Sequence, residues 1–229
     1  MCLSFVWRRD SVFIGMNFDY RQPYKLVTKD PNKFIVLAQG KPSFGVNSDG
    51  AFINHLMVET AKAGEYKRGK NVVHTIKLIQ DVLSGSIAQA DIGDYLDAIE
   101  IVNVPDSSCH CMIADKRGDV WIVEPGRGTI FSPATESPFY LMSNFSLCDC
   151  AKDGILTGDG VDRYTTALEL LRTTKQMDVT KAFEVLAATK QIGGDYPTVF
   201  SFVYSPIEYA VFYAVDGDFT DLQRFTFTN

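Results

Sequence analysis

The sequence predicts an α+β protein in which antiparallel sheets are covered by helices on their outer faces. Short alternating or apolar runs come in groups, helical periodicities separate those groups, and the strict strand-helix alternation of a parallel sheet is missing. The 229 residues, 46% of them hydrophobic, suit one compact core. We therefore expect a single domain over residues 1–229.

The first group of predicted strands lies in the amino-terminal quarter of the chain. Short runs of alternating or apolar residues are separated there by glycine-containing breaks and by the turn sequence Asn-Ser-Asp-Gly. We expect strands at Cys2–Trp7, Ser11–Phe18, Lys33–Leu37 and Ala51–Met57.

Two helices are predicted to follow this first group. Between Asn71 and Leu83 the apolar residues recur at helical spacing, and Gly85 just beyond them is a typical helix stop. A second, shorter helix is expected over Ile92–Ile99.

The rest of the chain repeats the order of strands and then helices. Strands are expected at Cys109–Ala114, Val120–Val123, Thr129–Phe131 and Pro138–Asn144, with residues 116–119 forming a connecting turn. Helices are predicted from Asp162 to about Leu171 and over Val179–Ala188. Two closing strands are expected at Thr198–Tyr204 and Tyr209–Val215.

Composition excludes several function classes. The net charge is −6 without a basic tract or basic helix face, which argues against a nucleic-acid or anionic-membrane partner. No apolar run approaches the ~18–20 residues of a membrane helix, and no secretory leader is apparent. Five cysteines, an odd count, fit reduced thiols better than a disulfide framework. We therefore expect a cytoplasmic protein.

Cys2, directly behind the initiator methionine, suggests a catalytic chemistry. If Met1 is removed, one residue carries a thiol of pKa ~8.5 and a free α-amine of pKa ~7.7–8.0. A nucleophile and a proton acceptor then stand within reach of each other at neutral pH. The alternative is that residue 2 belongs to an ordinary first strand.

Several short segments, taken in order, resemble one known family. They are Met1-Cys2, Gly15-Met16-Asn17-Phe18-Asp19-Tyr20, Gly45-Val46-Asn47-Ser48-Asp49-Gly50, Met142-Ser143-Asn144, Asp162-Arg163-Tyr164 and the hairpin from Thr198 to Tyr213. Together they resemble the choloylglycine hydrolase and penicillin V acylase family, which are linear amide C–N hydrolases of the N-terminal-nucleophile superfamily. The resemblance implies a four-layer αββα sandwich of two antiparallel sheets.

The resemblance also implies roles for five residues. Cys2 would attack the amide carbonyl through its sulfur and form a thioester, and Asp19 would hold the α-amine. The side chain of Asn144 and the backbone N–H of Asn47 would form the oxyanion hole. Arg163 would favour the thiolate by its fixed charge.

The assignments of Asp19, Asn47 and Arg163 each have a plainer alternative, and the alternative for Asn144 is weaker. Asp19 fits a turn after a strand, Asn47 fits ordinary hairpin-turn chemistry, and Arg163 fits a helix start paired with Asp159 or Asp162. Met16 is a departure, because the family usually has arginine there. If that arginine helps to hold the thiolate or the substrate, this protein has either lost its contribution or moved it, with Arg163 and Arg21 as the candidates.

The function expected from these features is hydrolysis of a small-molecule acyl amide without a cofactor. The alternatives are an acyltransferase that uses the same residues and a catalytically inactive binding protein, with zinc as an optional stabilising ion. Two Cys-x-Cys pairs, Cys109 with Cys111 and Cys148 with Cys150, raise that zinc alternative, although buried core cysteines explain them more simply and we expect no metal. A homo-oligomer is left open.

Overall fold

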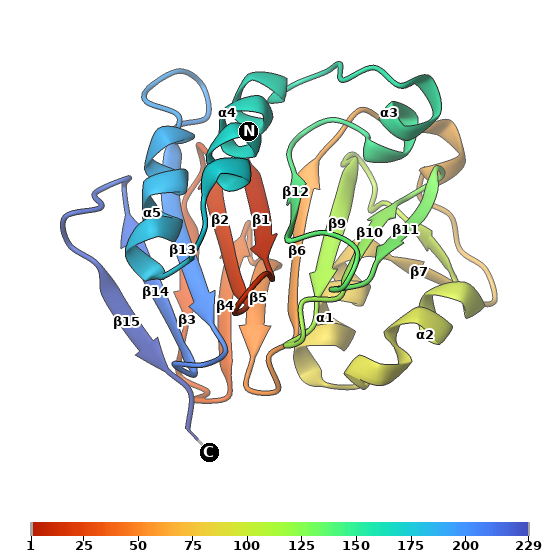
Figure 1. Ribbon diagram of the computed structural model, residues 1–229. Helices are drawn as coiled ribbons and strands as arrows, with labels where there is room; N and C mark the ends of the chain where they lie inside the picture. The colour runs from red at the N-terminus through yellow and green to blue at the C-terminus, as the bar shows by residue number, and fades with distance from the viewer. Residues whose placement is uncertain (1, 229) are drawn as a thin grey trace.

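The computed structural model describes residues 2–228 as two antiparallel sheets that pack face to face (Figure 1). The first sheet has the strand order β12-β1-β2-β13-β14-β15. Its bounds are β1 Leu3–Trp7, β2 Phe13–Asp19, β12 Phe139–Met142, β13 Thr198–Ser205, β14 Ala210–Val215 and β15 Gln223–Thr226. We call it the six-stranded sheet.

The second sheet, called here the seven-stranded sheet, has the order β11-β10-β9-β6-β5-β4-β3. Its bounds are β3 Tyr24–Val27, β4 Lys33–Ala38, β5 Lys41–Asn47, β6 Phe52–Met57, β9 Cys109–Ala114, β10 Val120–Glu124 and β11 Gly128–Ser132. A separate parallel pair is formed by β7 Val72–His74 and β8 Glu100–Val102.

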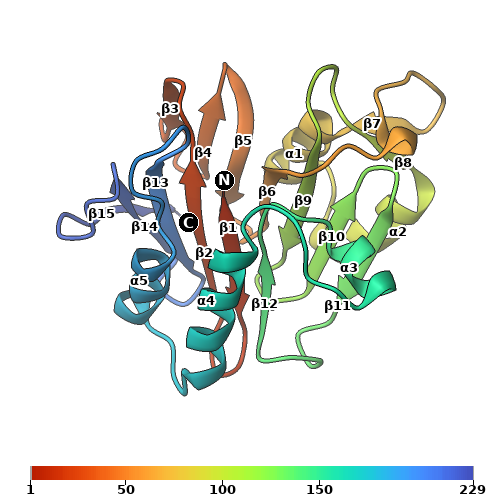
Figure 2. The ribbon, with the colours of Figure 1, turned by 90° about the horizontal axis from the view of Figure 1, so that it is seen from above.

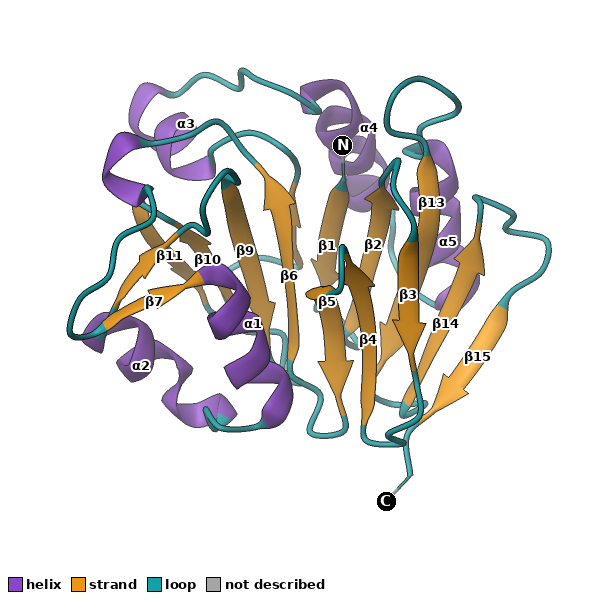
Figure 3. Cartoon of the chain, turned by 180° about the vertical axis from the view of Figure 1, so that it is seen from behind, coloured by secondary structure: helices purple, strands orange, loops and turns teal. Residues whose placement is uncertain are grey.

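Helices cover the outer faces of both sheets (Figures 2 and 3). α1 Thr75–Ser84 and α2 Ile92–Ala98 pack on the seven-stranded sheet, while α4 Val161–Thr173 and α5 Val179–Ala188 pack on the six-stranded sheet. α3 Leu147–Asp153 lies beside β11, and two short 3-10 helices span Lys62–Gly64 and Gln89–Asp91. The expected αββα layering is therefore confirmed.

Strand alternation divides the buried side chains between two environments. Along β1, Leu3, Phe5 and Trp7 pack under α4 and α5, whereas Cys2 and Val6 face the other sheet. Aromatic rings fill the space between the sheets. The rings of Phe44 and Phe202 stack across it with centroids 5.4 Å apart.

Most predicted elements are present, with shifted ends. Gly85 ends α1 with φ +75°, as expected of a helix stop. The helix expected from Asn71 begins only at Thr75, because residues 72–74 are extended and pair with β8, and His74 caps the helix by accepting the Lys77 N–H.

Six elements were not predicted from the sequence: β3, β5, β7, β8, β15 and α3. β5 and β15 are interrupted by proline, glycine or charged residues, which obscure a period of two. Within residues 2–228, no helix has both the length and the apolar character required to cross a bilayer.

Phe202→Ala should lower the free energy of unfolding by about 3–5 kcal/mol, because it leaves a cavity between the two sheets. Ile207→Ala is the control, since Ile207 is 76% exposed and its loss should cost less than about 0.5 kcal/mol. Urea denaturation followed by circular dichroism measures both changes. Equal losses for the two variants would contradict the assignment of this core.

Candidate active site

Cys2 lies immediately before β1, at the end of the sandwich where β2 finishes (Figure 1). Its side chain faces the core between the sheets, and the residue is only 6% exposed. The backbone N–H of Asp19 donates to Cys2 Sγ at 3.4 Å, and the thiol lies 3.8 Å from the Asp19 carbonyl oxygen. The pairing of β1 with β2 therefore holds the thiol against the last residue of β2.

The Asp19 carboxylate is buried and accepts two side-chain hydrogen bonds. Arg163 Nη1 lies 2.8 Å from Oδ2, and the Thr198 hydroxyl lies 2.5 Å from Oδ1. Burial raises the pKa of the Asp19 carboxyl, while Thr198 and Arg163 act in the opposite direction. The last residue of β2, the first residue of β13 and helix α4 are thus joined at one carboxylate.

Arg163 reaches this carboxylate from the first turn of α4. Gly160, the residue that caps the helix, has φ +80°, and a Cβ there would lie 2.3 Å from Ser143 Oγ and 2.7 Å from Arg163 Nη2. Both the conformation and the space require glycine at this position. The close approach of α4 to the end of β12 depends on it.

Asn144 lies two residues beyond the end of β12, close to the residue that precedes β1. The antiparallel pairing of β12 with β1 ends at Met142, opposite Ser4. The Ser143 hydroxyl donates to the Cys2 carbonyl oxygen at 3.1 Å. Asn144 Nδ2 donates one hydrogen to the Met57 carbonyl oxygen at 2.7 Å. A second hydrogen remains on that nitrogen, since an amide group carries two.

The thiol of Cys2 is held in its neutral form. Burial, together with the negative charge of Asp19, raises the pKa of the Cys2 thiol to about 12, and the Arg163 guanidinium acts against this increase. The charge of Arg163 therefore lowers the pKa of the thiol, as expected, but the increase caused by burial is larger. Met1, whose removal was expected, lies outside the described residues.

Four of the five predicted site residues thus lie together, namely Cys2, Asp19, Asn144 and Arg163. The fifth, Asn47, was a wrong assignment. Its backbone N–H already donates to the Ala51 carbonyl oxygen, and its side chain binds Val82 and Ala51. Asn47 is a turn and helix-contact residue, so it offers no free backbone donor.

The position of Asn47 leads to the same correction. Asn47 is the last residue of β5, three residues before Gly50. A Cβ built on Gly50 would lie 3.1 Å from the Tyr204 hydroxyl, so this turn lies beside Tyr204. Tyr204 pairs with Ile14, whereas Asp19 lies five residues further along β2, about 16 Å away at the usual rise of a strand. Asn47 therefore belongs to the end of the sandwich opposite Cys2.

Met57, which the sequence analysis did not single out, accepts a hydrogen bond from Asn144 through its backbone carbonyl. The Val58 N–H donates to the Ser108 carbonyl oxygen, and Met57 stands opposite Cys109. Hydrogen-bonded and non-bonded pairs alternate in antiparallel strands, so the N–H and C=O of Met57 both point away from β9, on the side from which Asn144 binds. A backbone donor has no signature in the sequence.

Met16, which replaces the family arginine, is fully buried between the sheets. The Asn54 side chain donates to Met16 Sδ at 3.5 Å. Of the two arginines expected to compensate, Arg163 lies in the site, whereas Arg21 is exposed and stacks on Tyr196. The positive charge near Cys2 thus comes from α4.

The cysteine pairs lie on two different elements. Cys109 and Cys111 are on β9, while Cys148 and Cys150 are on α3. Among residues 2–228, no group of three or more His, Cys, Asp or Glu side chains is arranged to hold a metal ion. The described cysteines are all free thiols.

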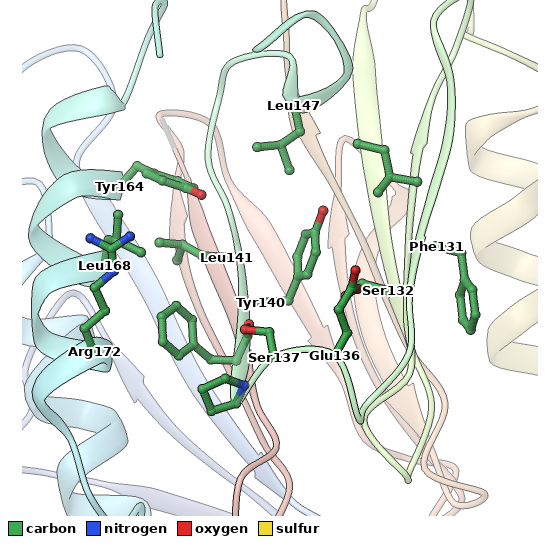
Figure 4. A pocket seen from close by; sticks show the side chains of 13 residues that line it. Phe131, Ser132, Glu136, Ser137, Tyr140, Leu141, Leu147, Tyr164, Leu168 and Arg172 are labelled. Atoms are coloured by element: carbon green, nitrogen blue, oxygen red, sulfur yellow. The ribbon is translucent and has the colours of Figure 1, made fainter. Parts of the chain in front are cut away.

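Two cavities lie near the site. Figure 4 shows a groove of about 630 Å³ between α4 and the strands β11 and β12, with Tyr140, Tyr164 and Leu168 in its wall. A second cavity of about 360 Å³ is lined by Arg163, Lys190 and neighbouring residues. Cys2 lines neither of these two cavities. The second cavity reaches Arg163, which lies on the helix-covered face of the six-stranded sheet, and not the thiol.

No protein-family model matches the chain, and no curated protein matches it by sequence. Solved structures do match it. A variant of the conjugated bile acid hydrolase from Clostridium perfringens has a TM-score of 0.72 at 13% identity, over 99% of this chain and 92% of its own.

Two further structures agree. Penicillin V acylase from Agrobacterium tumefaciens has a TM-score of 0.68 at 17% identity, over 93% of this chain and 83% of its own. The Caenorhabditis elegans ortholog of N-acylethanolamine-hydrolyzing acid amidase has a TM-score of 0.54 at 16% identity, over 90% of this chain and 93% of its own. The chain therefore has the N-terminal-nucleophile hydrolase fold.

Proposed function

We propose that this protein is a cysteine amidohydrolase that cleaves a linear acyl amide through a thioester, after removal of Met1. The observation that carries the proposal is the position of Cys2, whose thiol contacts Asp19 and whose carbonyl oxygen accepts the hydroxyl of Ser143, the neighbour of Asn144. The names of the structural neighbours, a hydrolase, an acylase and an amidase, support the same chemistry.

The acylation step uses both functional groups of one residue. The α-amine of the processed Cys2 accepts the thiol proton, and Sγ attacks the amide carbonyl. The amine then passes this proton to the leaving nitrogen, so that the C–N bond breaks and a thioester remains. Water, deprotonated by the same amine, hydrolyses the thioester and restores the thiol.

The Asp19–Arg163 pair controls the charge around this amine. An α-ammonium beside the Asp19 carboxylate is stabilised and oriented by it, while the charge of Arg163 opposes the increase that burial causes in the pKa of Asp19. An ammonium on Cys2 itself would also oppose the increase that burial causes in the pKa of the thiol. Processing therefore creates the base and activates the nucleophile.

The tetrahedral oxyanion needs donors on the inner side of Cys2. Two donors can serve this purpose: the second hydrogen of Asn144 Nδ2, and the backbone N–H of Met57, which points away from β9 toward Asn144. Each such donor contributes on the order of 3 kcal/mol to the transition state. Met57 thus takes the role first assigned to Asn47.

Cys2→Ala should abolish hydrolysis of a panel of N-acyl amides while the protein stays folded, because it removes the attacking sulfur. Intact mass should show that Met1 is absent from active protein. Cys111→Ala is the matched control, since that thiol lies on the opposite face of the seven-stranded sheet, in the core under α1. Turnover by Cys2→Ala equal to that of the wild type would rule out Cys2 as the nucleophile.

Asn144→Ala should lower kcat about 10²–10³-fold, because it removes one oxyanion donor. Alkylation of Cys2 by iodoacetamide passes through no oxyanion, so its rate should change less than about twofold. The contrast between steady-state kinetics and peptide-mapped alkylation measures the effect. A parallel loss of both rates would instead place Asn144 in thiol activation.

Arg163→Met should move the pH midpoint of Cys2 alkylation upward. The thiolate is the reactive form, and without the guanidinium the Asp19 charge disfavours it more strongly, which raises the thiol pKa. Arg163→Lys keeps a positive charge and should shift the midpoint less. The measurement is a pH series of iodoacetamide labelling; an unchanged midpoint in Arg163→Met would contradict the electrostatic role.

A further inference from the structure

A fully buried histidine lies next to the proposed oxyanion donor. His110 of β9 faces the core between the sheets, and its Nε2 lies 2.8 Å from the Ser143 carbonyl oxygen. Its Nδ1 lies 3.0 Å from Glu124 Oε1. Both ring nitrogens of His110 therefore face oxygen atoms. The function proposed above gives no role to His110 or to Glu124.

The Glu124 carboxylate is ionised. It accepts the N–H of Leu147 at 2.8 Å, the N–H of Cys148 at 3.3 Å and the hydroxyl of Ser146 at 2.5 Å. Although burial opposes ionisation, hydrogen bonds from His110, Ser146 and Leu147 lower the pKa of Glu124 to about 2. The Ser143 carbonyl oxygen can only accept, so Nε2 of His110 carries a hydrogen and donates it to Ser143, while Nδ1 shares a hydrogen bond with the Glu124 carboxyl group.

The hydrogen-bonded pair of His110 and Glu124 holds the chain on both sides of Asn144. His110 fixes the carbonyl of Ser143 on one side, and Glu124 fixes the backbone N–H groups of residues 147 and 148 on the other. The Ser143 hydroxyl in turn binds the Cys2 carbonyl oxygen. Asn144 thus stands in a short segment that is anchored to β9, β10 and the start of β1.

We propose that His110 and Glu124 are positioning residues that set the distance between Asn144 and Cys2 for acyl transfer. This inference rests on the proposed function. A buried polar pair is a weak device for stability, because apolar side chains of similar volume stabilise a core as well or better. Its value here is directional, since two buried groups with fixed hydrogen bonds define one position for the segment 143–147.

Two substitutions at His110 separate the contacts. The amide nitrogen of glutamine can take the place of Nε2 and still donate to Ser143, whereas that of asparagine takes the place of Nδ1 and can reach only Glu124. His110→Asn should lower kcat about 10²-fold with little change in KM, and His110→Gln should lower it less than about tenfold. Equal losses in the two variants would overturn the proposal.

His74→Asn is the matched control. His74 caps α1 on the outer face of the seven-stranded sheet, where asparagine serves equally well as a cap. Its kcat should stay within about twofold of the wild type. If His110→Asn does not fold, because it leaves the buried Glu124 carboxylate without its partner, His110→Asn with Glu124→Gln removes both titratable groups and replaces it in the comparison.

A double-mutant cycle tests whether His110 acts through Asn144. In an Asn144→Ala background, the donor to be positioned is absent, so His110→Asn should cost less than about threefold in kcat. The same 10²-fold loss in both backgrounds would show an independent role and overturn the proposal. Iodoacetamide alkylation of Cys2 should change less than about twofold in His110→Asn, because it needs no oxyanion donor.

Failure of the proposed function has a different signature. If Cys2→Ala retains full activity, the nucleophile assignment fails whatever the His110 variants do. Hydrogen exchange then tests the positioning by itself: His110→Asn should increase exchange at the amides of residues 143–148, and His110→Gln should increase it less. Unchanged exchange in both variants would overturn the positioning role without reference to turnover.

Discussion

The buried ion pair between Asp19 and Arg163 is the interaction on which the site depends. It joins the end of β2 to the first turn of α4, across the outer face of the six-stranded sheet, while the backbone of the same aspartate contacts the Cys2 thiol on the inner face. Asp19 thus connects the helix-covered outer face of the six-stranded sheet with its inner face, which packs on the other sheet. Removing either charge would leave the other buried without the opposite charge that it now contacts at 2.8 Å, at a cost of several kcal/mol.

Around this pair, the rest of the site is set by strand register. β12 pairs with β1 in one register, which brings Ser143 onto the Cys2 carbonyl oxygen and Asn144 close to the start of β1. Gly160 and the His110–Glu124 pair restrict the segment after β12 from two sides. The core of aromatic rings fixes the distance between the sheets, so Met57 of β6 comes within reach of Asn144.

The sequence predicted the layered architecture because alternation along strands and periodicity along helices are local properties. It also predicted Cys2, Asp19, Asn144 and Arg163 as site residues, through short segments whose order resembles a known family. Asn47 was assigned wrongly because a turn motif does not reveal at which end of the sandwich it lies. Met57 acts through its backbone, and the His110–Glu124 contact joins strands whose pairing no short segment specifies, so neither could be predicted.

The two ends of the described chain have a practical consequence. Cys2 lies at one end of the sandwich, whereas Phe227 packs on Tyr204 and Tyr209 at the other, as Figures 1 and 3 show. A fluorescent protein or a surface linker attached behind β15 would therefore be held far from the thiol. Attachment in front of Cys2 would instead cap the nitrogen that the chemistry requires, so reagents for this protein should be built from its carboxyl end.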